Sequence, residues 1–89
     1  VDEIDRESTT SVLIIEDEPL ISMQLEDLVT SLGHEVCGTA ATRTQALEVV
    51  NQRTPGLVLA DIQLADGSSG LDAVDDILAI DTVPVIFIT

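Results

Sequence analysis

The sequence predicts an α/β domain with a doubly wound parallel sheet and helices on both of its faces. Short apolar, β-branched runs alternate with segments of helical periodicity in the order β-α-β-α-β-α-β. Such an order requires crossover connections, which favour parallel strands. The length of 89 residues, 45% of them apolar, fits one domain with a modest aliphatic core and excludes two domains.

The first strand and helix follow a polar segment. Residues 1–10 alternate charged and small polar side chains, so we expect an acidic linker or tail there. Ser11–Ile15 is the almost wholly apolar run typical of a strand buried on both faces. Pro19 then suits a first helical position, and Gly33 suits a helix stop. Apolar residues at helical spacing between them predict one core face: Ile21, Leu25, Leu28, Val29 and Leu32.

The second strand and helix are predicted on weaker signals. Residues 34–40 are a strand candidate. Thr42 and Gln45 match a capping box, in which the two side chains satisfy backbone N–H groups at a helix start. The helix that follows is expected to end near residue 54, before Pro55 and Gly56.

The last strands and helix repeat the pattern. Leu57–Ala60 is another apolar run of the buried-strand type, and Asp61 follows it directly. A loop rich in glycine and serine over residues 66–70 leads into a third helix, and residues 83–89 (VPVIFIT) predict a fourth strand. The core face of the third helix is expected to carry Leu71, Val74, Ile77 and Leu78.

Chemically active side chains stand at the carboxyl ends of three predicted strands. Glu16 and Asp17 follow the first strand, Asp61 follows the third and Thr89 ends the fourth. Ligands of doubly wound sheets bind at this edge, so these residues should meet in space. Carboxylates brought together repel one another unless a cation neutralises them, and Mg²⁺ is the ion that such oxygen ligands suit. Zinc would require more than the one histidine and one cysteine that the chain has.

An aspartate beside a divalent ion can attack a phosphoryl group, because the ion offsets the repulsion between the two anions. Asp61 would then carry an acyl phosphate, and the Thr89 hydroxyl could donate a hydrogen bond to it. Each acid also has a plainer interpretation: Glu16 and Asp17 could serve a helix N-terminus, and Asp61 could simply start a loop. Two buried-type strands that both end on acids favour the metal site.

Charge and cysteine content restrict the partners and the location. The formal net charge of −14 repels nucleic acid and anionic membranes, so we expect no direct contact with either. Cys37 is the single cysteine, so no internal disulfide forms. The sequence shows no signal peptide, and its apolar runs are too short to cross a bilayer, which favours a cytoplasmic location.

From Ser11 to Thr89 the sequence resembles the receiver domains of two-component response regulators. The resemblance rests on VLIIEDEPL, LVLADIQLADGSSGLDAV and VPVIFIT. It implies a flavodoxin-like sheet of strand order 2-1-3-4-5, with Asp61 as the phosphoacceptor and Thr89 as the hydroxyl that senses the phosphoryl group. It also implies a Mg²⁺ ion bound directly by Asp17, by Asp61, largely through water by Glu16, and by the backbone carbonyl of Gln63.

The family also has a lysine at the end of its fifth strand, and this sequence contains no lysine. We therefore expect residues 11–89 to be a receiver domain that lacks its C-terminal third. The segment DIQLADGSSGLDAV, after an acidic linker, resembles more narrowly the PhyR type of general stress regulator. That resemblance implies a sigma-factor-like output domain upstream of residue 1 that binds an anti-sigma factor. The phosphate donor would be a sensor histidine kinase or a phosphotransferase, and the domain would signal rather than act as an enzyme.

Two other functions remain open on the sequence. A magnesium-dependent phosphohydrolase of the haloacid dehalogenase kind also uses a strand-end aspartate as its nucleophile. That family has a second aspartate two positions later, where this chain has Gln63. The other alternative is a receiver-like interaction module that is not phosphorylated. The presence of Glu16, Asp17, Asp61 and Thr89 together disfavours it.

Overall fold

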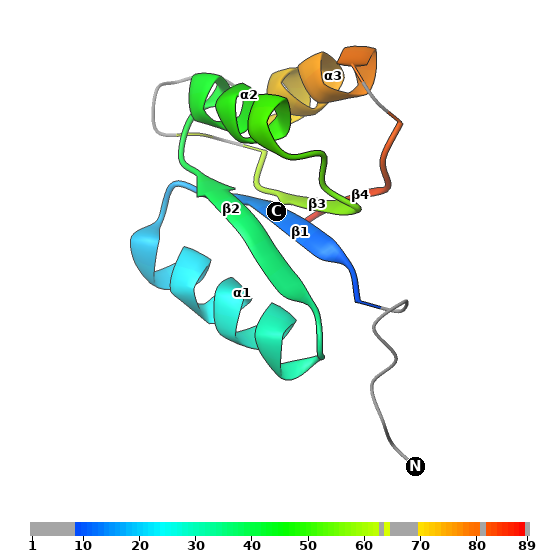
Figure 1. Cartoon of the computed structure of the whole chain (residues 1–89). Helices are drawn as coiled ribbons and strands as arrows, with labels where there is room; N and C mark the ends of the chain where they lie inside the picture. The colour runs from blue at the N-terminus through cyan, green and yellow to red at the C-terminus, as the bar shows by residue number, and fades with distance from the viewer. Residues whose placement is uncertain (1–8, 63, 65–69, 81, 89) are drawn as a thin grey trace.

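The computed structural model of the chain describes residues 9–62, 64, 70–80 and 82–88 (Figure 1). Strands and helices alternate along it in the predicted order. The elements are β1 (Ser11–Ile15), α1 (Pro19–Ser31), β2 (Glu35–Ala40), α2 (Arg43–Gln52), β3 (Leu57–Ala60), α3 (Gly70–Ile80) and β4 (Val85–Phe87).

The four strands form one parallel sheet of order β2-β1-β3-β4, which confirms the doubly wound, flavodoxin-like fold. The first strand in the sequence, β1, is an inner strand of the sheet, and later strands lie on both sides of it. Ile15, the last residue of β1, stands opposite Ala40 of β2 and Ala60 of β3. The carboxyl ends of these three strands therefore lie at the same edge of the sheet.

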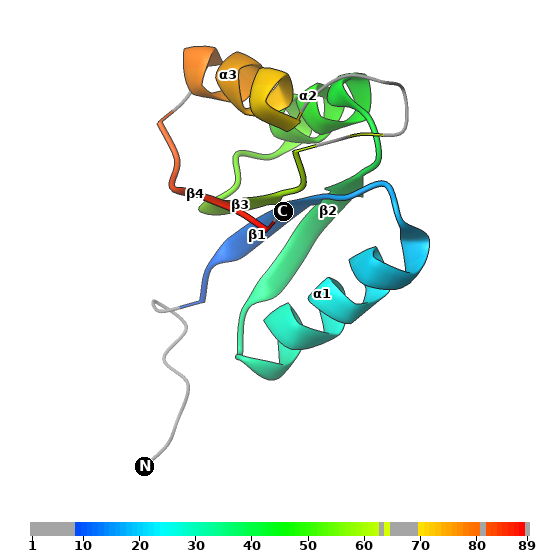
Figure 2. The same cartoon turned by 180° about the vertical axis from the view of Figure 1, so that it is seen from behind.

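Helices cover both faces of the sheet, α1 on one face and α2 with α3 on the other (Figures 1 and 2). Successive residues of a strand point to opposite faces, so β1 supplies both cores. Val12 and Ile14 pack with Val29 of α1. Leu13 and Ile15 belong to the larger cluster, which includes side chains of α2 and α3. Burial on both faces explains why β1 is apolar nearly throughout.

The predicted core face of α1 is correct only in part. Val29 is buried and Leu25 is half-buried, but Leu28 is 53% exposed and Leu32 is 65% exposed. Each residue of a helix is rotated by roughly 100° from the previous one, so Leu28 cannot share the inward direction of Val29. The inward stripe includes the polar Ser22, which is buried. Ile21, also expected in the core, is 42% exposed, as Leu71 and Leu78 of α3 are at 48% and 43%.

Helix ends agree with the predicted signals. The Thr42 side chain accepts a hydrogen bond from the backbone N–H of Gln45 at 3.1 Å, as a capping box requires. The Gln45 amide oxygen accepts from the backbone N–H of Ala41 at 2.8 Å. Gly33 follows α1 with a φ of 89°, a left-handed conformation that costs glycine little.

The fourth strand is shorter than predicted. The sequence predicts a strand over residues 83–89, whereas β4 covers Val85–Phe87 and pairs with β3. Pro84 has no N–H to donate, and only its carbonyl joins the ladder, where it accepts from Val58 at 3.0 Å. Thr89 lies outside the described residues. Among the helices of the described part, none is long and apolar enough to span a membrane.

Candidate functional site

Sheet pairing brings three acidic residues together just beyond the strands. The backbone N–H of Glu16 donates to the carbonyl of Ala40 at 2.9 Å, which continues the pairing of β1 with β2. On the other side, the N–H of Asp61 donates to the carbonyl of Ile15 at 2.8 Å. The residues that follow β1 and β3 are therefore held side by side by the backbone itself.

Glu16, Asp17 and Asp61 each offer a carboxylate oxygen, and these oxygens all lie within 4.8 Å of one another. Glu16 is 5% exposed, whereas Asp17 and Asp61 are half-buried. Oxygen ligands of this kind fit a hard divalent cation, and the absence of histidine and cysteine in the cluster disfavours zinc. The described residues thus contain an acidic cluster that can hold a metal ion.

Burial makes the Glu16 carboxylate hard to ionise. Its pKa is raised from 4.5 to about 7, chiefly because the group is removed from water. The backbone N–H of Glu18 donates to Glu16 Oε1 at 3.1 Å and opposes the rise. A hydrogen bond with Asp61 and the charges of Asp61 and Asp17 add to it. A cation in the cluster would favour the ionised form, so metal binding there would be accompanied by release of the Glu16 proton.

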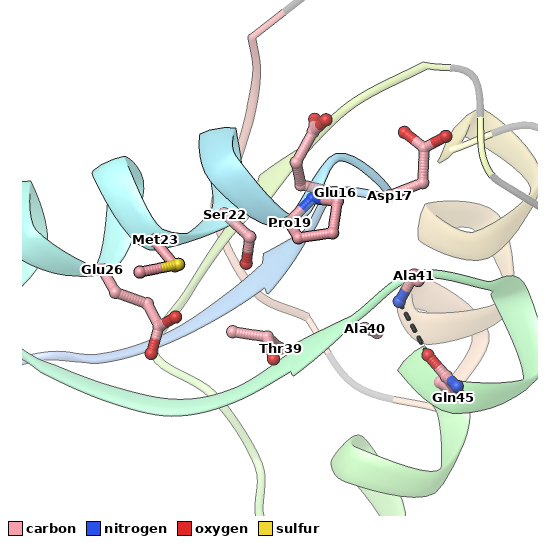
Figure 3. Close-up of a pocket in the computed structure, with 10 residues that line it drawn as sticks. All are labelled: Glu16, Asp17, Pro19, Ser22, Met23, Glu26, Thr39, Ala40, Ala41 and Gln45. Carbon is pink, nitrogen blue, oxygen red and sulfur yellow. Dashed lines mark hydrogen bonds between the residues drawn. The ribbon is translucent and has the colours of Figure 1, made fainter.

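Of the five site residues that the sequence predicts, the structure brings together Glu16, Asp17 and Asp61. In Figure 3 the first two lie at the start of α1, beside a pocket. Gln63 and Thr89 lie outside the described residues. The strand leading to Thr89 is in place, since the N–H of Ile88 donates to the carbonyl of Ala60 at 2.9 Å.

Gly70 has a role in this site that the sequence did not reveal. It is the first residue of α3, it is buried, and its N–H donates to the carbonyl of Ile62. A Cβ at this position would overlap the backbone carbonyl of Asp61. Only glycine therefore lets α3 begin against the segment that carries Asp61. In the sequence Gly70 reads as a turn residue, because a close approach between segments leaves no local signal.

Comparison with known proteins places this arrangement in a family. The family model of the response regulator receiver domain matches residues 12–89. The Phyllosphere-induced regulator PhyR of Methylorubrum extorquens is 62% identical over 94 residues, covering 100% of this chain and 35% of that protein. The chain thus spans about a third of the length of this relative.

Solved structures of PhyR proteins have the same fold as this chain. The receiver domain of PhyR from Erythrobacter litoralis superimposes with a TM-score of 0.89 at 73% identity, covering 93% of this chain and 64% of that one. The anti-anti-sigma factor PhyR of Bartonella quintana, in a complex with the anti-sigma factor NepR, gives a TM-score of 0.88 at 60% identity, covering 94% and 35%. This chain therefore belongs to the response regulator receiver domain family, and within that family it is similar to the receivers of PhyR regulators.

Proposed function

We propose that this domain accepts a phosphoryl group on Asp61 and thereby controls an output domain. The observation that carries the proposal is the meeting of Glu16, Asp17 and Asp61 within 4.8 Å at the carboxyl edge of the sheet. Asp61 is half-buried, so part of the residue is open to solvent, from which a phosphodonor would approach. In the reaction, a carboxylate oxygen of Asp61 attacks the phosphorus atom of a phosphohistidine. The P–N bond breaks, the released histidine nitrogen takes up a proton from solvent, and an acyl phosphate remains on Asp61.

The acidic cluster fits Mg²⁺, because its donors are carboxylate oxygens alone. Asp17 and Asp61 would bind the ion directly, Glu16 largely through water, and Gln63 through its backbone carbonyl. The ion supplies positive charge that offsets the repulsion between the carboxylates and the incoming phosphoryl group. Thr89 would donate its hydroxyl proton to a phosphoryl oxygen and so report the modification to the rest of the domain.

The phosphate donor is proposed to be a sensor histidine kinase or a phosphotransferase. The proposed output is a sigma-factor-like domain upstream of residue 1 that binds an anti-sigma factor in the cytoplasm. The complex between a similar PhyR protein and the anti-sigma factor NepR supports this partner. The domain would act in signalling, with at most weak autophosphorylation and autodephosphorylation of its own.

Phosphorylation by a small phosphodonor tests the proposal. Incubated with acetyl phosphate, the protein should gain one phosphoryl group only when Mg²⁺ is present, and Asp61→Asn should gain none because an amide cannot form an acyl phosphate. The exposed Asp72→Asn is the matched control and should be modified normally. Modification of Asp61→Asn at the parental level would refute the assignment and leave an unphosphorylated interaction module as the better interpretation.

A further inference from the structure

The segment that leads into β1 is tied to the start of β2 by hydrogen bonds. Thr10, the residue before β1, donates its backbone N–H to Nδ1 of the His34 imidazole at 3.0 Å. The carbonyl of Thr10 accepts from the backbone N–H of Glu35 at 3.1 Å. These bonds lie at the amino ends of the parallel strands, whereas the acidic cluster lies beyond their carboxyl ends (Figure 1). This corner of the fold is therefore separate from the phosphoacceptor site.

The backbone of His34 is itself held in place. Its N–H donates to the carbonyl of Val29 in α1 at 3.1 Å. Gly33, the residue before it, has the left-handed φ that turns the chain from α1 into β2. His34 is half-buried, and its bond to Thr10 joins residues that are 24 positions apart in sequence. The imidazole thus bridges the turn after α1 and the segment before β1.

The bond between Thr10 and His34 requires an uncharged imidazole. Nδ1 accepts a hydrogen bond from the Thr10 N–H, so it carries no proton of its own, and the single ring proton is on Nε2. When the ring takes up a second proton, Nδ1 becomes a donor and two N–H groups face each other. Histidine is the side chain that changes its charge between pH 5 and 8. The bond is therefore sensitive to pH in that range.

The charged groups that face this corner in the described part of the chain are Glu35, at the start of β2, and Arg53, which follows α2. They form an ion pair with each other. The Ser11 hydroxyl also donates to Glu35 at 3.1 Å and accepts from Arg53 at 2.8 Å. The last turn of α1, residues 28–31, has no charged residue, and neither do β1 and β3. Both charges are thus engaged with partners other than Thr10.

We propose that His34 is a pH-sensitive latch for the segment that enters β1. With a neutral imidazole, the backbone of Thr10 is bonded both to Nδ1 and to Glu35. With a charged imidazole, the bond to Nδ1 is lost. The next residue stays in the sheet, because the Ser11 carbonyl accepts from the Gly56 N–H at 2.7 Å. The latch therefore loosens the entering segment without opening the sheet. Its effect on an upstream output domain rests on the proposed function, whereas the latch itself does not.

The full chain, labelled with ¹⁵N, is followed by NMR from about pH 8 to about pH 5. The Thr10 amide and the His34 ring signals should shift together, with one midpoint. Protection of the Thr10 amide against exchange with water, corrected for the intrinsic effect of pH, should fall roughly fivefold. His34→Asn keeps an acceptor oxygen but cannot ionise, so its Thr10 amide should stay at the parental high-pH position. His34→Ala has no acceptor, so its Thr10 amide should stay at the parental low-pH position.

Control variants separate the latch from other acids. Glu16→Gln should keep the Thr10 response, which excludes an indirect effect of the Glu16 carboxyl, whose pKa of about 7 falls in the same range. Glu35→Gln and Asp61→Asn should also keep it. The proposal is overturned if the parental Thr10 amide does not shift while the His34 ring titrates, if it shifts equally in His34→Asn or His34→Ala, or if Glu16→Gln abolishes the shift. Circular dichroism verifies folding, and either His34 variant decides alone where the other does not fold.

Discussion

Replacing Glu16 by glutamine should change the way in which stability depends on pH. The carboxylate is 5% exposed and its pKa rises from 4.5 to about 7 on folding, mainly through burial. Between these pH values the folded state keeps a proton that the unfolded state has lost. The stabilising contribution of neutral Glu16 is therefore complete below pH 4.5, declines as the pH rises, and is lost above about pH 7. Glutamine keeps the shape and the acceptor for the Glu18 N–H but cannot ionise.

The magnitude follows from the size of the pKa change. A rise of about 2.5 pH units, at about 1.4 kcal/mol per unit, corresponds to about 3 kcal/mol. Without divalent ions, Glu16→Gln should therefore be about as stable as the parent at a pH near 4.5, the pKa of Glu16 in the unfolded state. It should be more stable than the parent by about 3 kcal/mol at roughly pH 8, where the parent carries the buried charge.

Urea denaturation followed by circular dichroism, with a chelator present throughout, measures this difference as a function of pH. Glu48→Gln serves as the control for the loss of one negative charge from an exposed position. Its stability should follow the parent curve. If the Glu16→Gln and parent curves ran parallel from acid to alkaline pH, Glu16 would not be a buried, proton-binding group and the argument would fail.

The proposed coordination predicts that Asp17→Asn weakens Mg²⁺ binding more than Glu16→Gln, because, of these two residues, Asp17 would touch the ion directly and Glu16 largely through water. Equal losses in a calorimetric titration would contradict this ranking. Thr42→Ala should lower the free energy of unfolding by about 1 kcal/mol through loss of the helix cap, measured by urea denaturation against the exposed Thr44→Ala. Gly70→Ala should cost about 3 kcal/mol, because the new methyl group overlaps the Asp61 carbonyl. An unchanged urea midpoint for either variant would disprove its structural explanation.

The sheet was predictable because β1 and β3 are buried and apolar in short runs, which few other elements produce. The acidic cluster was predictable for a related reason. Glu16 and Asp61 follow these runs directly, and neighbouring parallel strands end at the same edge. These apolar runs and the acids that follow them therefore predicted both the fold and the meeting of the three carboxylates without any tertiary information.

What the sequence could not provide depends on packing between segments. Leu28 and Leu32 have the helical spacing of core residues, yet both are exposed, because an apolar side chain does not reveal which stripe of α1 faces the sheet. The burial of Ser22 was hidden for the same reason. The raised pKa of Glu16 and the close approach of Gly70 to Asp61 both arise from neighbours distant in sequence.

The most direct test of the central claim is to locate the phosphoryl group. The protein is incubated with acetyl phosphate and Mg²⁺ and then treated with sodium borohydride, which reduces an acyl phosphate to an alcohol. Peptide mass spectrometry identifies the reduced residue. The account predicts that position 61 alone is converted, from aspartate to homoserine, and that no conversion occurs without Mg²⁺. Conversion at Asp17 or at another acid, with Asp61 intact, would contradict it.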